Sequence, residues 1–229
     1  MFAPVQNKRL YEQVAEQIQE MILDGRLKSG DRLPAERIMA EQFNVSRNSI
    51  REAIRALEIL GIAESRQGGG NFIVAGKSSC LFEPLSIMFK LHNGTFTDLL
   101  EIRRGLEMEA AALAAQRITP DEAAGLVSTM EALKHADSEQ RSIELDKQLH
   151  LQIAELSGNV MLSGFLNAIS RLLEQAVRDG RKLILSSCRN DETLIAMHQE
   201  LCNAIIAKES KSAARICCKH FDFILDNLK

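Results

Sequence analysis

The stretch LPAERIMAEQFNVSRNSIREAIRALEILGIAESRQGGGNFI, residues 33–73, decides the fold of the first part of the chain. Pro34 suits the start of a helix over about 35–43, because its fixed φ is already helical and its missing N–H is not needed there. A tight turn follows, and Ser46 is a good N-cap for a second helix over 47–60. The stretch therefore predicts two short helices joined by a turn.

A hairpin is expected directly after these helices. Gly61 ends the second helix, and the short segments 62–65 and 71–74 have the apolar, branched residues of strands. The run Gly68–Gly70 between them suits a reversal of the chain. Upstream, residues 10–24 carry apolar side chains on one helical stripe. The order helix, helix, turn, helix, hairpin is that of a winged helix-turn-helix domain.

The helix over 47–60 has the features of a DNA-reading helix. Four apolar residues share one face and should pack on the other helices: Ile50, Ala53, Ile54 and Leu57. Three arginines recur every fourth position beside that face: Arg47, Arg51 and Arg55. Such a stripe could be only a solvated face, but lysine would serve that purpose equally well. Arginine is the side chain suited to bidentate hydrogen bonding with guanine or phosphate.

The chain changes texture near residue 76. The small polar segment 75–79 has the composition of a linker, and the sequence after it has few glycines or prolines. We expect the winged helix-turn-helix domain over 1–76, a linker over 77–80, and a second domain over 81–229. In the last of these, helical periodicity and short loops predict an antiparallel bundle. Its expected helices are 81–90, 95–116, 120–135, 138–157, 160–186, 190–208 and 210–228.

Composition agrees with a mainly α protein that has a real core. Apolar residues make up 45% and aromatic residues only 4%, which disfavours an extensive sheet. The 28 basic and 31 acidic side chains leave a formal charge of −3, which excludes a polybasic tail. Five cysteines without a CxxC pair argue against a disulfide framework or a thiolate zinc site. No apolar run approaches the ~20 residues that span a bilayer. We therefore expect a cytoplasmic protein with no membrane partner.

Four polar residues at helical positions in the second part could share one divalent metal ion. Asp146 lies four residues before His150, on the same helix face, and His198 and His220 belong to two later helices. One carboxylate and three imidazoles suit Zn²⁺, Mn²⁺, Ni²⁺ or Fe²⁺. The alternative is that these residues have no role in metal binding, because an Asp–His pair at this spacing is common on helix surfaces. From the residues alone, both interpretations remain open.

Residues 33–73 closely resemble the N-terminal domain of the gluconate-repressor (GntR) family of bacterial transcription regulators. The pattern LP-x-ER…VSRNSIREA…GI…G-x-G carries the resemblance. It implies DNA contacts at five positions: Arg37, Arg47, Asn48, Arg51 and, through the backbone of the wing tip, Gly68. Two departures occur: Ala35 stands where Ser is common, and Asn44 where Gly is common. The first removes a helix-capping side chain, whereas Asn tolerates the left-handed conformation of a turn.

The second part is similar to the ligand-binding domain of the fatty-acid-regulator (FadR) branch of that family. The segments LLEIRRGLEMEAAALAAQRIT, ELDKQLHLQIAELSGN, MHQELCNAI and KHFDFI carry this likeness. It implies an all-helical antiparallel bundle with a divalent metal held by Asp146, His150, His198 and His220. An arginine of the motif L-x-E-I-R usually assists effector binding, which points to Arg103. The neighbouring Arg104 is the alternative, and it would face about 100° away on the same helix.

The two resemblances together imply a homodimeric transcription regulator on a palindromic double-stranded DNA operator. Repression is the commoner role in the family. The expected effector is a small carboxylate, a 2-hydroxy or 2-oxo acid such as lactate, bound at the metal. One alternative is a regulator for which the ion itself is the signal. Another is a metalloenzyme, but the spacing places no further acid or base beside the metal, so we expect no enzymatic activity.

Overall fold

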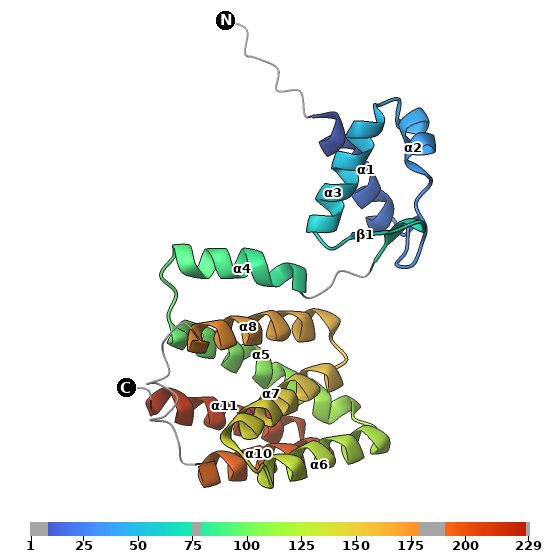
Figure 1. Ribbon diagram of the computed structural model, residues 1–229. Helices are drawn as coiled ribbons and strands as arrows, with labels where there is room; N and C mark the ends of the chain where they lie inside the picture. Colours follow the sequence, from blue (N-terminus) through green and yellow to red (C-terminus); the bar gives the residue numbers. More distant parts are fainter. Residues whose placement is uncertain (1–8, 75–78, 179–190, 228–229) are drawn as a thin grey trace, which may run out of the picture. The chain divides into compact units, whose positions relative to one another are not determined.

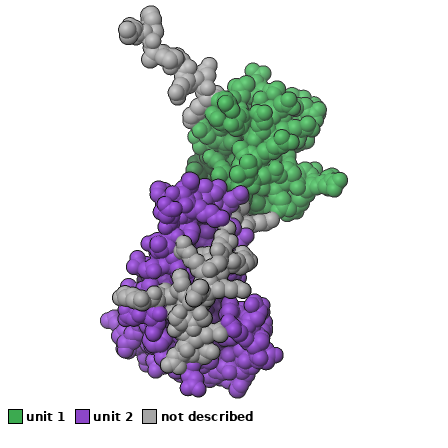
Figure 2. Space-filling view, turned by 60° about the vertical axis from the view of Figure 1, so that its left-hand side comes forward, with its two compact units in different colours: residues 1–80 green, residues 81–229 purple. Residues whose placement is uncertain are grey.

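The structure is a computed structural model that describes residues 9–74, 79–178 and 191–227. It divides into two compact units, residues 1–80 and 81–229 (Figure 2). The expected boundary at residue 76 lies among residues 75–78, which are outside the described part.

The first unit is three helices followed by a two-stranded hairpin (Figure 1). Its elements are α1 (Leu10–Leu23), α2 (Glu36–Phe43), α3 (Arg47–Ile59), β1 (Ala63–Arg66) and β2 (Gly70–Ile73). The strands are antiparallel, with pairs running from Ala63 opposite Ile73 to Arg66 opposite Gly70. Each strand is displaced by one residue from the sequence prediction. The winged helix-turn-helix architecture itself is confirmed.

Local chemistry explains where α2 and α3 begin and end. The Ser46 side chain accepts a hydrogen bond from the Ser49 amide and caps α3. Asn44 ends α2 in the left-handed conformation, with φ of 51°. Ala35 provides no side-chain cap to α2, as its departure from the family pattern implies. The turn between the helices is thus fixed by Asn44 and Ser46.

The second unit is a bundle of helices (Figure 1). They are α4 (Ser79–Leu91), α5 (Phe96–Arg117), α6 (Pro120–Lys134), α7 (Glu139–Leu156), α8 (Val160–Arg178), α10 (Asp191–Ile206) and α11 (Ser210–Asp226). All seven expected helices are present. The expected continuation of the fifth helix to residue 186 lies outside the described residues. Among the described helices, none combines the length and apolar character needed to cross a bilayer.

Capping residues fix several starts in this bundle. Thr95 with Asp98, and Thr119 with Glu122, form reciprocal capping boxes at α5 and α6. The Asn159 side chain accepts hydrogen bonds from two amides in the first turn of α8. Asn159 is therefore the N-cap of α8.

The helix α5 is the centre of the second unit, because it packs against α7, α8, α10 and α11. Its buried positions include small residues that allow close packing: Ala110, Ala111, Ala114 and Ala115. Among the described residues of this unit, five arginine, glutamate and histidine side chains are buried: Arg103, Glu107, His150, His198 and His220. Burial of so many polar groups is costly unless they are paired or ligated. These five residues come from α5, α7, α10 and α11, which all meet in the core.

Candidate functional site

The helix α3 presents a polar face beside its buried one. Ile50, Ala53, Ile54 and Leu57 are buried, as the sequence predicts. Arg47, Asn48 and Arg51 are exposed at its N-terminal end. The amides at a helix N-terminus attract phosphate, and the groups displayed there can reach base edges. The arrangement can therefore meet DNA.

Two of the expected DNA-contacting arginines are held by carboxylates. The Arg51 Nε donates to Glu36 Oε2 at 2.8 Å, and Arg37 Nη1 donates to Glu41 Oε1 at 2.6 Å. Because Arg51 uses Nε, its two terminal nitrogens keep their N–H groups for another acceptor. Arg47 makes no ion pair with any residue in the described ranges.

The wing tip depends on glycine at Gly68. Its φ of +72° is a backbone conformation that residues with a side chain rarely adopt, although a Cβ there would meet no atom within 4 Å. Backbone conformation, and not crowding, therefore requires glycine. The exposed tip leaves the backbone accessible to a phosphate or a groove.

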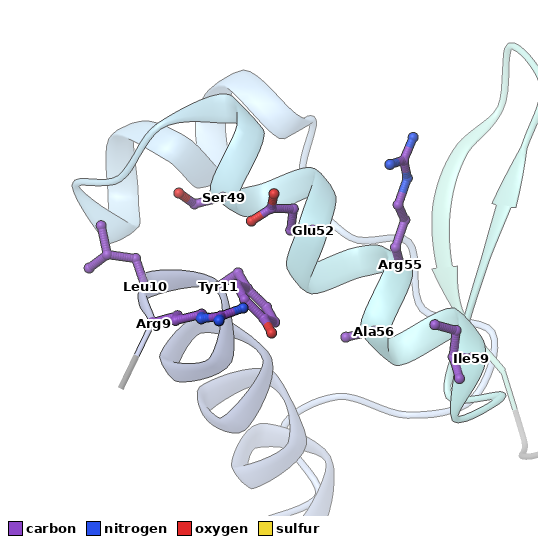
Figure 3. A pocket seen from close by; sticks show the side chains of 8 residues that line it. All are labelled: Arg9, Leu10, Tyr11, Ser49, Glu52, Arg55, Ala56 and Ile59. Carbon is purple, nitrogen blue, oxygen red and sulfur yellow. The ribbon is translucent and has the colours of Figure 1, made fainter. Parts of the chain in front are cut away.

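A shallow groove lies between the start of α1 and α3 (Figure 3). Eight residues line it: Arg9, Leu10, Tyr11, Ser49, Glu52, Arg55, Ala56 and Ile59. Of the arginine stripe on α3, only Arg55 belongs to this lining. The groove mixes charges of both signs and lacks Arg47, Asn48 and Arg51, so it is separate from the expected DNA-contacting set.

In the second unit, three imidazoles converge from three helices. His150 comes from α7, His198 from α10 and His220 from α11, and one ligand atom of each lies within 4.8 Å of the others. The Nε2 atoms of His150 and His198 are 3.1 Å apart. Asp146 Oδ1, one turn before His150, lies 3.3 Å from His198 Nε2 and 3.8 Å from His150 Nε2. The structure thus gathers all four residues of the expected metal set in one region.

The pKa shifts of two of these imidazoles, His198 and His220, favour metal binding. Burial lowers the pKa of His198 to about 4, and burial with the nearby imidazoles holds the pKa of His220 well below its usual value. Both rings are therefore neutral and have a free lone pair at neutral pH. Burial also opposes charge on His150, but the Glu107 carboxylate outweighs it and raises the pKa of His150.

The donor set fits a divalent first-row cation. Imidazole nitrogen and carboxylate oxygen are usual ligands of Zn²⁺, Mn²⁺, Ni²⁺ and Fe²⁺. His198 Nε2, His150 Nε2 and Asp146 Oδ1 lie within 3.1 to 3.8 Å of one another, so nitrogen and oxygen ligand atoms meet in a largely buried place. A cation stabilises such an arrangement. His198 Nδ1 and His220 Nδ1 are also buried and have no hydrogen-bond partner among the described residues, which is uncommon in cores.

The neighbouring arginines of α5 have different environments. Arg103 is buried, and its guanidinium contacts Glu107 and lies 5.5 Å from the centre of the Phe221 ring. Arg104 is partly exposed and pairs with Asp222 of α11 at 2.8 Å. Of these two alternatives for effector binding, Arg103 is the one in the buried polar cluster.

Sequence reasoning missed Glu107, which is 4% exposed and joins Arg103 to His150. The available signal was its spacing, four residues after Arg103 and hence on the same face of α5. This finding corrects the expectation that no further acid or base lies beside the histidines. Both Glu107 oxygens already have partners.

The comparisons with known proteins assign both units. The model of "Bacterial regulatory proteins, gntR family" matches residues 10–73, and the FCD domain model matches residues 98–223. The chain belongs to the gntR family. It is a transcription regulator with an FCD effector-binding domain, and the matched domains and relatives are those of regulators, not enzymes.

Relatives that match over most of the chain are named as regulators. The HTH-type transcriptional regulator LutR of Bacillus subtilis is 32% identical over 91% of this chain and 96% of its own. The putative L-lactate dehydrogenase operon regulatory protein of Escherichia coli is 31% identical over 97% of this chain and 87% of its own. Among solved structures, Streptococcus agalactiae GntR superposes with a TM-score of 0.68 at 26% identity, covering 94% of this chain and 99% of that one. The regulator is thus related to lactate operon regulators.

Proposed function

We propose that this regulator holds a divalent cation with Asp146, His150, His198 and His220. The observation that carries the proposal is the meeting of three buried imidazoles from separate helices, with a carboxylate beside two of them. A pair of neutral His rings is poorly explained by core packing, since apolar residues would fill the space at less cost. A bound cation would supply Lewis-acid positions for oxygen atoms of an effector.

The effector would be a small 2-hydroxy or 2-oxo carboxylate, such as lactate. Adjacent oxygens on C1 and C2 of such an acid suit a cation with open positions, and Arg103 supplies a buried positive charge nearby. The name of the E. coli relative, an L-lactate dehydrogenase operon regulatory protein, supports this choice of acid. The acid must bind the DNA-competent and incompetent states differently to have any effect.

The DNA partner would be a palindromic operator bound by a homodimer, because a two-fold dimer matches a two-fold site. We assign its contacts to Arg37, Arg47, Asn48, Arg51 and the Gly68 backbone. The residues 1–76 would form the DNA-binding domain, and residues 81–229 the domain for the effector and for dimerisation. We propose repression in the bacterial cytoplasm, where the operator lies.

A second candidate is a regulator for which the metal ion itself is the signal. One observation favours it: both contacting nitrogens of Arg103 are already held by Glu107, at 2.6 and 2.7 Å. The positive charge of Arg103 is therefore already balanced by a buried carboxylate, which weakens its attraction to an acid. Binding of the ion alone does not depend on the charge of Arg103.

Operator binding measured by fluorescence anisotropy separates these two functions. The operator is first selected from random-sequence DNA with purified protein, and the protein is then stripped with chelator. We expect Zn²⁺ to restore the metal-loaded state and L-lactate or pyruvate to change operator affinity only in that state. A change with Zn²⁺ that neither acid alters would support the metal-responsive regulator. Affinity that ignores both metal and acid would contradict both candidates.

A further inference from the structure

Glu107 connects two parts of the proposed sensor through its two oxygens. Oε1 accepts from Arg103 Nε at 2.7 Å and contacts Nη2 at 2.6 Å, and Oε2 lies 2.5 Å from His150 Nδ1. All three side chains are at least nine-tenths buried. Water therefore competes little for these contacts, and a continuous series of polar contacts connects α5 with α7.

We propose that Glu107 is a positioning residue that orients His150 for metal binding and transmits the state of Arg103 to the metal centre. The inference rests on the proposed metal site. It adds a route by which an acid bound at Arg103 changes the affinity for metal, and by linkage the metal changes the affinity for the acid equally.

The orienting role follows from hydrogen-bond chemistry. An ionised carboxylate can only accept, so His150 Nδ1 carries the proton and donates it to Glu107. The lone pair of His150 is then on Nε2, the atom that faces His198 Nε2 and Asp146 Oδ1. A carboxylate behind a ligating histidine fixes the ring and raises its basicity, and loss of such a partner typically weakens metal binding about 10- to 100-fold.

The transmitting role follows from the sharing of one negative charge. Arg103 draws the Glu107 charge toward Oε1, which weakens what Oε2 offers to His150. An acid carboxylate that binds the remaining N–H groups of Arg103 shares its positive charge, and so leaves more of the Glu107 charge for His150. Metal affinity should therefore rise when Arg103 is engaged elsewhere, or when its charge is removed.

Zinc affinity of the full-length protein tests both roles without knowledge of the effector. Zn²⁺ is titrated against a chelating dye for the wild type, Glu107→Gln, Arg103→Gln and the double variant. Glu101→Gln is the matched control, since Glu101 is an exposed glutamate on the same helix. We expect about 10- to 100-fold weaker binding for Glu107→Gln and no change for the control. Arg103→Gln should bind more tightly than the wild type.

The double variant distinguishes positioning from structural damage. Glu107→Gln leaves the Arg103 charge buried without its partner, so it can weaken the fold, whereas Arg103→Gln with Glu107→Gln removes both charges. We expect the double variant to fold and still bind Zn²⁺ as weakly as Glu107→Gln. The gain in zinc affinity from Arg103→Gln should therefore be lost in that background, because the effect passes through Glu107. Visible absorption of bound Co²⁺ reports the change in coordination independently.

The outcomes that overturn the proposal are distinct. Recovery of wild-type zinc affinity in the double variant would show that Glu107 acts only structurally. An equal gain from Arg103→Gln in both backgrounds would show direct repulsion between Arg103 and the metal, without transmission. A wild-type protein that binds no Zn²⁺, Co²⁺ or Ni²⁺ would instead remove the metal site itself.

Discussion

Arg47 differs from the other arginines of the expected DNA contact, because no carboxylate of the described ranges holds it. Arg37 and Arg51 have such partners, Glu41 and Glu36. An arginine at the first position of a recognition helix can grip a guanine edge with two hydrogen bonds, at about 1–3 kcal/mol. Arg47 is therefore the residue on which sequence-specific binding should depend most.

We expect Arg47→Ala to weaken operator binding about tenfold or more, and to reduce the ratio of the affinity for operator to the affinity for random DNA. Electrophoretic mobility shifts on both DNAs measure this. Lys134→Ala is the control, since it removes one positive charge from the second unit. Equal losses on operator and random DNA would mean that Arg47 contacts only phosphate.

His198 is the central ligand of the proposed metal site, since its Nε2 lies 3.1 Å from His150 Nε2 and 3.3 Å from Asp146 Oδ1. His198→Ala should abolish stoichiometric zinc and the response to acid together. Metal content after equilibrium dialysis, read by mass spectrometry, is the measurement. His135→Ala is the control, because that histidine is 81% exposed at the end of α6. Unchanged zinc content in His198→Ala would contradict the four-residue site.

Sequence reasoning identified the histidines but not Glu107, and the reason is physical. The five histidines are few enough to be considered one by one, and the family resemblance then favours three of them as metal ligands. A glutamate in α5 is unremarkable, because helix surfaces carry many. Only the fold shows that Glu107 is buried against a ring contributed by a different helix. Contacts between residues 43 positions apart leave no local pattern.

At the scale of elements, the starts of several helices can be predicted from the sequence because capping residues mark them. Ser46, Thr95 and Thr119 each accept a backbone N–H in the first turn of the helix that follows. The helix α5 shows the limit. It is buried on several sides, so its sequence has no single apolar stripe to tell whether Arg103 or Arg104 faces inward. The packing of α11 and α7 against it decides that.

Thr119 tests the value of a cap. In α6 its side chain accepts from the Glu122 amide, and the Glu122 carboxylate accepts from Thr119 N and Oγ1. Thr119→Ala should cost about 1 kcal/mol and lower the Tm of the second unit by about 2–8 °C. Thermal melts followed by circular dichroism measure this. Thr97→Ala, at an exposed site in the first turn of α5, makes the same side-chain change without a cap. An equal Tm for the two variants would contradict the capping role.

At the scale of the whole molecule, net charge says little about DNA binding. The formal charge is −3, and residues 1–76 contain ten basic and ten acidic side chains. Long-range attraction to DNA is therefore weak, and affinity must come from a few placed arginines and helix N-termini, doubled in a dimer. Each phosphate contact still releases counterions, so binding should fall steeply with salt. The position of each charge is what matters.

The two units have separate cores. The first packs Val14, Ile18, Ile50 and Leu57 with their neighbours, and the second packs its own clusters around α5. No buried apolar cluster of the described residues includes members of both. Since multi-domain chains often unfold in steps, we expect two transitions in calorimetry of the full-length protein.

Zn²⁺ should raise the transition temperature of residues 81–229 only, because a ligand stabilises the unit that binds it. At a free Zn²⁺ concentration of 1,000 times Kd, the gain in the free energy of unfolding is about 4 kcal/mol. Chelator should reverse the shift. Two variants assign the transitions. Leu57→Ala should lower the transition temperature of the first unit only, since it costs that unit about 2–5 kcal/mol of stability. His198→Ala should remove the effect of Zn²⁺. A single transition that Zn²⁺ raises as a whole would mean that the units unfold together. In that case metal binding would stabilise the DNA-binding unit directly, and the signal would need no separate route between them.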